Sequence, residues 1–208
     1  MRSFAKFQKS MLLLIGNWLQ EMLLPNRLTI ARIFLTTLFI IAVECPFRWN
    51  MTAALILFTL AVLTDFFDGK LARRWGIVTS FGKLIDPLAD KVLNTSAFIL
   101  LTVHAALPVG VVLIIMAREF LITGLRLLAG NQGVTLPAEK LGKHKTIWQM
   151  TTIFFFLTLM AFSEWKWQAT LWTFIWIYGG IWVIAITVAL TLYSGLGYLW
   201  NNRLLLAD

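Results

Sequence analysis

The sequence predicts an all-α, polytopic membrane protein with six transmembrane helices, preceded by an amphipathic helix in the membrane interface. Of its 208 residues, 59% are hydrophobic and 13% are charged, and the mean hydropathy is +0.79. Several apolar stretches approach or exceed the roughly 18–20 residues that a helix needs to cross a bilayer. These stretches are continuous rather than alternating, which favours helices over a barrel, because a helix satisfies its own backbone hydrogen bonds in lipid.

The N-terminal segment, residues 1–24, is expected to lie in the plane of the membrane interface. Charged residues such as Lys6 and Glu21 are mixed there with large apolar residues such as Phe4, a composition that suits interfacial helices. A Pro-Asn pair ends this segment. We therefore expect a separate six-helix domain at residues 25–208.

The expected spans follow from apolar runs interrupted by turn residues. The second span is expected to continue as a helix beyond the membrane surface to Arg73 and Arg74, and a glycine-containing loop at 130–142 precedes the fifth. The six expected spans lie at about residues 28–43, 51–68, 82–105, 109–128, 146–162 and 169–198.

The distribution of basic residues predicts the orientation in the membrane. The net charge of +8 would suggest nucleic acid in a soluble protein, but here the Lys and Arg residues flank apolar runs. They are concentrated in the N-terminal segment and in the loops after the second and fourth spans, while the opposite loops are nearly free of them. Positively charged loops stay in the cytosol, so both chain ends are expected there.

The acidic residues are concentrated in one stretch. Four of the 10 Asp and Glu residues fall between Asp65 and Asp90, in the pattern D-x-x-D-G-x-x-A-R, eight residues, G-x-x-x-D-x-x-x-D. Asp65 and Asp68 are three residues apart and Asp86 and Asp90 are four apart, so each pair shares one helix face. Both pairs border apolar runs, where carboxylates are costly and indicate a functional site.

Four carboxylates in one place would repel one another unless cations lay among them. A short loop joins the second and third spans, so these helices are expected to be antiparallel neighbours that bring the four together. Divalent cations with oxygen ligands suit such a site, and paired metal ions clamp the attacking and leaving oxygens in phosphoryl chemistry. Gly69 and Gly82 would give a bulky group access to the backbone, and Arg73 can bind a pyrophosphate. The alternative interpretation is that the aspartates are helix caps and interfacial charges. It explains a single aspartate better than it explains all four in this pattern.

The stretch from Asp65 to Asp90 resembles the signature of the CDP-alcohol phosphotransferases without departure. That family consists of six-helix membrane enzymes that transfer a phosphatidyl or phospho group from a CDP-linked donor to an alcohol and release CMP. The resemblance implies two divalent metal ions, Mg²⁺ or Mn²⁺, one held by Asp65, Asp68 and Asp86 and the other by Asp65, Asp86 and Asp90. It also implies that Asp90 is the general base. The implied CDP pocket is lined by Gly69, Ala72, Arg73 and Gly82.

Five basic residues outside the signature form a candidate acceptor site. Arg118 and Arg126 are eight residues apart, so they lie two turns apart on one face of the fourth span. An arginine inside an apolar span needs an anionic partner, and an ion pair with Glu119 or a signature aspartate is the alternative for Arg118. The expected loop after this span adds Lys140, Lys143 and Lys145. Together the five residues have the character of a phosphate-binding patch.

The acceptor segments A-R-E-F, G-L-R and K-L-G-K-x-K-T are similar to those of the bacterial phosphatidylglycerophosphate synthases, a branch of the same family. Pro25 to Thr29 together with Arg32 fits their entry to the first span, so the resemblance covers residues 25–146. It implies transfer of the phosphatidyl group from CDP-diacylglycerol to glycerol 3-phosphate, a step in phospholipid biosynthesis that yields phosphatidylglycerol phosphate and CMP.

Two alternatives remain open from the sequence. A family member could use another phosphorylated alcohol, such as inositol phosphate. A cation transporter could use the carboxylates as an ion site, but the internal repeats and broken helices common in transporters are missing from this sequence. The expected partners are CDP-diacylglycerol, glycerol 3-phosphate and membrane lipids, with a homodimer as a possible assembly and no nucleic acid. The expected location is the bacterial inner membrane, with the active site facing the cytosol.

Overall fold

The computed structural model describes residues 29–75, 80–131, 140–165 and 173–203. For the helix-end residues 67–75, 80–87, 131, 140–141 and 143 only the backbone is described. Every regular element in these ranges is a helix, which confirms the predicted all-α class. The amphipathic segment expected at residues 1–24 lies outside the described residues.

The helices agree with the expected spans in order and differ from them mainly at their ends. A helix covers residues 29–44. It is followed by α2 (Asn50–Trp75), α3 (Ser80–Val103), α4 (Val109–Asn131), α5 (Lys140–Glu164), a π-helical segment η1 (Ile175–Gly179) and α7 (Gly180–Asn201).

The main difference concerns the start of α5. The sequence places Lys140, Lys143 and Lys145 in a loop, but α5 begins at Lys140, six residues before the expected span at 146–162. Lysine is a good helix former, and the last proline before this helix is Pro137, so nothing between them stops the helix. The lysine cluster is therefore carried by a helix.

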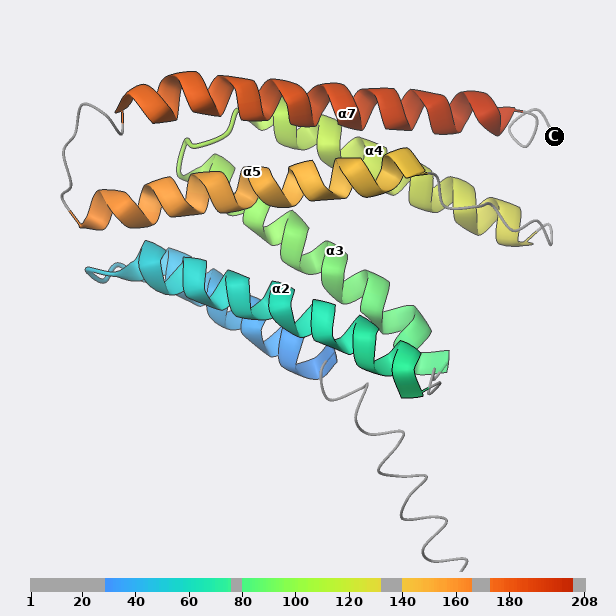
Figure 1. Ribbon diagram of the computed structural model, residues 1–208, viewed down its shortest axis with the longest axis horizontal. Coiled ribbons are helices and arrows are strands. Elements are labelled where there is room, and N and C mark those ends of the chain that lie inside the picture. Colours follow the sequence, from blue (N-terminus) through green and yellow to red (C-terminus); the bar gives the residue numbers. More distant parts are fainter. Residues whose placement is uncertain (1–28, 76–79, 132–139, 166–172, 204–208) are drawn as a thin grey trace, which may run out of the picture.

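Figure 1 shows how the helices pack and where their ends lie. α5 packs against both α2 and α7, and α4 also packs against α7. The chain alternates in direction, so that the end of α2, the start of α3, the end of α4, the start of α5 and the end of α7 lie at the same end of the molecule, on the right of the figure. We call this the signature end, because it carries both aspartate pairs.

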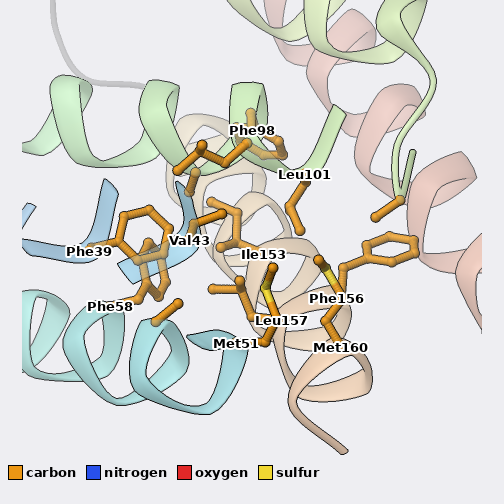
Figure 2. Packing of buried hydrophobic residues seen from close by; sticks show 14 of the residues in the cluster. Phe39, Val43, Met51, Phe58, Phe98, Leu101, Ile153, Phe156, Leu157 and Met160 are labelled. Atoms are coloured by element: carbon orange, nitrogen blue, oxygen red, sulfur yellow. The ribbon is translucent and has the colours of Figure 1, made fainter. Parts of the chain in front are cut away.

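The apolar core joins the helix at 29–44 with α2, α3 and α5 (Figure 2). Phe58 of α2 is fully buried, and its ring centroid lies 5.6 Å from that of Phe39 and 5.1 Å from that of Phe154. Leu101 of α3 and Ile153 of α5 are also almost fully buried. Such close aromatic packing holds helices together by dispersion, which operates in lipid as well as in water.

The outer surface of the helices is apolar, whereas the surface of a soluble helix bundle is polar. The buried face of α7 carries Gly180, Thr187, Thr191, Ser194, Gly195 and Tyr198. By contrast, Trp182 and Trp200 are each 70% exposed. Small and polar residues between helices, with large apolar residues outside, are typical of helices packed in a membrane. Two described helices, His144–Glu164 and Ile175–Asn201, are long and apolar enough to cross a bilayer.

At the end opposite the signature, Glu164 at the end of α5 caps the start of α2. Its carboxylate accepts hydrogen bonds from Met51 N (2.6 Å), Thr52 N (3.0 Å) and Thr52 Oγ1 (2.6 Å). The first backbone N–H groups of a helix have no partner within the helix, and a negative charge is favourable there. Trp49 and Trp165 pack beside this cap with ring centroids 5.2 Å apart. The cap thus links the start of α2 to the end of α5, although Met51 and Glu164 are 113 positions apart in the chain.

We expect Glu164→Gln to destabilise the protein without changing its catalytic site. The amide loses the charge and presents an N–H group to backbone donors, which costs about 1.5–3 kcal/mol for hydrogen bonds to a charged group. Thermal unfolding in detergent should show a midpoint lower by a few degrees. Glu44→Gln, which changes an exposed carboxylate at the same end, is the control. Equal midpoints for the two variants would contradict the role of the cap.

Candidate active site

Asp65, the first signature aspartate, is held by an arginine from the helix at 29–44. Its Oδ1 lies 2.7 Å from Nη2 of Arg32, whose side chain is only 1% exposed, while that of Asp65 is 48% exposed. The pair therefore connects a buried guanidinium to a carboxylate that remains open on its other side. A buried arginine needs such a partner, and the partner is fixed in orientation in return.

Several other signature residues are placed only by their backbone. Asp68, Gly69, Ala72 and Arg73 lie in the last turns of α2, and Gly82 and Asp86 lie in the first turns of α3. Their side chains are outside the described set, as are those of Lys140 and Lys143 at the start of α5. Among the residues that the structure describes, no group of three or more potential metal-binding side chains is present.

Asp90 lines a small cavity between α3, α4 and α5. The cavity has a volume of about 90 Å³, and its polar lining includes Asn94, Glu119, Lys145 and Gln149. Asn94, one turn further along α3, donates its amide to Asp90 Oδ1 at 3.3 Å. Asp90 itself is half-buried.

Charges from four helices act on this site. Asp90 of α3 interacts electrostatically with Asp65 of α2, Arg32 of the first described helix, Lys145 of α5 and Glu119 of α4. The two aspartates are therefore within electrostatic range of each other although 25 positions separate them in the chain. Like charges that repel each other favour a bound cation, and carboxylate oxygens are the ligands that Mg²⁺ and Mn²⁺ prefer. The chemistry of Asp65 and Asp90 therefore suits ligands of a divalent metal ion.

Glu119 organises the basic residues of the site. Its Oε1 accepts a hydrogen bond from Lys145 Nζ and lies 3.3 Å from Nη1 of Arg118. The alternative considered for Arg118, an ion pair with Glu119, is thus present in the structure. Lys145 is buried and also interacts electrostatically with Asp90. Two of the five predicted acceptor residues are therefore joined to the cavity through one carboxylate.

The two arginines of α4 both reach α7. Arg118, whose side chain is 12% exposed, donates from Nη2 to Ser194 Oγ at 3.2 Å. Arg126 is exposed and donates from Nε to the hydroxyl of Tyr198 at 3.1 Å, with its guanidinium 5.3 Å from the ring centroid. The structure thus confirms that the arginines share one face of α4.

Sequence reasoning missed the roles of Arg32 and Glu119. Arg32 is one of few charged residues within an apolar span, and that isolation was the available signal. Glu119 is adjacent to Arg118 and was considered only as its neutralising partner. The contribution of α7 had no signal in the sequence, because serine, glycine and tyrosine are ordinary residues in membrane helices.

Comparisons with known proteins cover most of the chain. The sequence model of the CDP-alcohol phosphatidyltransferase family matches residues 22–193. A CDP-diacylglycerol–glycerol-3-phosphate 3-phosphatidyltransferase of Escherichia coli strain K12 is 35% identical over 192 residues, which cover 89% of this chain and 97% of the relative. Proteins of the same name are 41% identical over 142 residues in Bacillus subtilis strain 168 and 43% identical over 127 residues in Rickettsia felis. These two alignments cover 62% and 61% of this chain and 74% and 70% of the relatives.

Proposed function

Because this chain belongs to the CDP-alcohol phosphatidyltransferase family, we propose that it transfers the phosphatidyl group from CDP-diacylglycerol to glycerol 3-phosphate. The products are phosphatidylglycerol phosphate and CMP. The observation that carries the proposal is that Asp90 of the signature lines the same cavity as Lys145, which shares the carboxylate of Glu119 with Arg118. The names of the relatives support the same donor and acceptor.

The proposed setting is the bacterial inner membrane, with six spans at residues 25–208 and an interfacial helix at 1–24. The apolar outer surface and the two helices long enough to cross a bilayer support a membrane location. The signature end faces the cytosol in this proposal, since the basic loops of the sequence lie on that side. The lipid donor then reaches the site from the bilayer, and the water-soluble acceptor reaches it from the cytosol.

Asp90 is the proposed general base. The primary hydroxyl of glycerol 3-phosphate attacks the β-phosphorus of the donor, which is the phosphorus bonded to diacylglycerol. Asp90 accepts the hydroxyl proton, the bond from this phosphorus to the bridging oxygen breaks, and CMP leaves with that oxygen. The cavity beside Asp90 has room for a group as small as the acceptor's glycerol, and it holds the hydroxyl near the carboxylate.

Asp65, Asp68, Asp86 and Asp90 are the proposed ligands of two divalent metal ions, Mg²⁺ or Mn²⁺. When bound, these ions neutralise the pyrophosphate of the donor and the charge that develops in the transition state. Arg32 orients the Asp65 carboxylate and leaves its exposed side available as a ligand. The proposed cytidine diphosphate pocket is lined by Gly69, Ala72, Arg73 and Gly82.

The phosphate of the acceptor is proposed to bind Arg118, Arg126, Lys140, Lys143 and Lys145. Arg118 and Lys145 share Glu119 as a counter-ion, so their positive charges are held in place before the acceptor arrives. Each guanidinium keeps further N–H donors for a phosphate, and arginine can bind phosphate oxygens with two parallel hydrogen bonds. A homodimer is the proposed assembly.

We expect Arg118→Ala to raise the KM for glycerol 3-phosphate roughly tenfold to a hundredfold, because a hydrogen bond to a charged group is worth about 1.5–3 kcal/mol. Arg126→Ala should act in the same direction with a smaller effect, since Arg126 is exposed, whereas Arg118 contacts Glu119 of the cavity lining. The KM for CDP-diacylglycerol should change little in both variants. Steady-state kinetics in mixed micelles, with each substrate varied in turn, measures these constants.

Arg48→Ala provides the control, because Arg48 is exposed at the opposite end of the bundle, stacked on Trp49. A panel of glycerol, glycerol 3-phosphate and inositol phosphate completes the test of the acceptor. Equal turnover with glycerol, or a KM change confined to the donor, would show that the basic residues do not bind an acceptor phosphate.

A further inference from the structure

Three residues of α7 meet the two arginines of α4 on a single face. Ser194, Gly195 and Tyr198 follow the spacing i, i+1, i+4, and all three are buried. Ser194 accepts a hydrogen bond from Arg118 at 3.2 Å, and Tyr198 accepts one from Arg126 at 3.1 Å. One short surface of α7 therefore contacts both side chains that we assign to the acceptor phosphate.

Gly195 is required by the position of Arg118 rather than by the backbone. The glycine lies inside α7, where any residue can adopt the conformation. A Cβ atom added at Gly195 would lie 2.9 Å from Cγ of Arg118, closer than two carbon atoms in contact allow. The side chain of Arg118 thus occupies the space that this glycine leaves open, and any larger residue would displace it.

An apolar contact between α4 and α7 lies between the two arginines and holds the two helices against each other. Ile122 and Leu125 of α4 lie between Arg118 and Arg126 in the sequence, and they pack in a buried cluster with Tyr198. Tyr198 therefore has two functions: its ring seals this contact, and its hydroxyl holds Arg126. A shift of α7 along α4 would move both guanidinium groups together.

Arginine has many rotamers, and fixing them in advance lowers the cost of binding a ligand. We propose that Ser194, Gly195 and Tyr198 are positioning residues that hold Arg118 and Arg126 in the geometry required for the acceptor phosphate. The proposal rests on the assignment of these arginines to the acceptor under the proposed function. All three residues lie beyond the segment that the family model matches, because that segment ends at residue 193.

The decisive variant is Gly195→Ala, with Gly197→Ala as its matched control. Both substitutions add one methyl group to the same helix, two positions apart, but a Cβ at Gly197 would have nothing within 4 Å. We expect Gly195→Ala to raise the KM for glycerol 3-phosphate roughly tenfold, because small displacements of binding groups are costly, with the donor KM unchanged. Gly197→Ala should leave both constants at the level of the unmodified protein.

Tyr198→Phe tests the second arginine independently. The variant keeps the ring in the apolar contact and removes only the hydroxyl that accepts from Arg126. We expect a rise of about threefold to tenfold in the KM for glycerol 3-phosphate, with unchanged donor KM. Ser194→Ala should raise the acceptor KM in the same way through Arg118. Thermal unfolding of each variant separates these effects from a general loss of structure.

The outcomes distinguish this inference from the function on which it rests. If Arg118→Ala raises the acceptor KM but Gly195→Ala and Tyr198→Phe do not, the positioning role is wrong and the proposed acceptor site stands. If Arg118→Ala itself has no effect on the acceptor, the site assignment fails first. Equal changes in the donor and acceptor constants would show a merely structural role and overturn the inference. Should Gly195→Ala fail to fold, Tyr198→Phe and Ser194→Ala decide the question.

Discussion

Replacement of Asp65 by asparagine is expected to abolish transfer while leaving the fold intact. Asp65 is the proposed ligand of both metal ions, and asparagine has the same shape without the charge. Metal ions contribute several kcal/mol of charge stabilisation to such reactions, so the rate should fall roughly a thousandfold or more. The amide oxygen can still accept from Arg32, which limits the cost of leaving that buried guanidinium without its charged partner.

The measurement is turnover of CDP-diacylglycerol and glycerol 3-phosphate by the purified variant at saturating Mg²⁺, with thermal unfolding as the test of folding. Glu44→Gln, which neutralises an exposed carboxylate far from the signature end, is the control for a change of charge. A chelator should stop the unmodified enzyme, and Mg²⁺ or Mn²⁺ should restore it. Undiminished turnover by Asp65→Asn would remove the carboxylate from the mechanism.

The second large effect is expected from Asp90→Asn. A general base contributes roughly 100- to 10,000-fold to the rate, so kcat should fall within that range. The KM for CDP-diacylglycerol should change much less, because Asp65, Asp68 and Asp86 can still hold one metal ion. The side chain at position 90 should also keep its place in this variant, because Asn94 donates to Asp90 Oδ1 and an asparagine at position 90 retains that oxygen.

Single-turnover kinetics separates the chemical step from donor binding in this variant. Ser96→Ala is a suitable control on the same helix, because Ser96 lies outside the cavity lining that includes Asp90. A loss of donor binding in proportion to the loss of rate would mean that Asp90 acts mainly as a metal ligand. A rate within a few-fold of the unmodified enzyme would remove it from both roles.

The all-α class and the family signature could be predicted from the sequence because both depend on local patterns. Apolar runs of sufficient length determine where membrane helices form, and the spacing of Asp65 to Asp90 is visible in the chain itself. The family resemblance predicted from that spacing is confirmed by the match over residues 22–193. The roles of the individual aspartates, the donor pocket and the metal ions stay predictions.

The contacts that position the site could not be predicted, because they join residues that are remote in the chain. The pair of Arg32 with Asp65 depends on how the first described helix lies against α2, and the contact of Arg118 with Ser194 spans 76 positions. The early start of α5 at Lys140 has a similar origin. The charged residues ended the apolar run, and hence the predicted span, but a helix continues beyond an apolar run wherever its backbone hydrogen bonds can form.

The central claim is that the hydroxyl of glycerol 3-phosphate attacks the phosphorus bonded to diacylglycerol. A double-label transfer measures this directly, with ³²P in the β-phosphate of CDP-diacylglycerol and ³H in glycerol 3-phosphate, using the purified protein and Mg²⁺. We predict a lipid product that contains both labels in equal amounts, together with an equal amount of CMP free of ³²P. Label in the cytidine nucleotide, or no ³H in lipid under conditions where the protein is folded, would contradict the account.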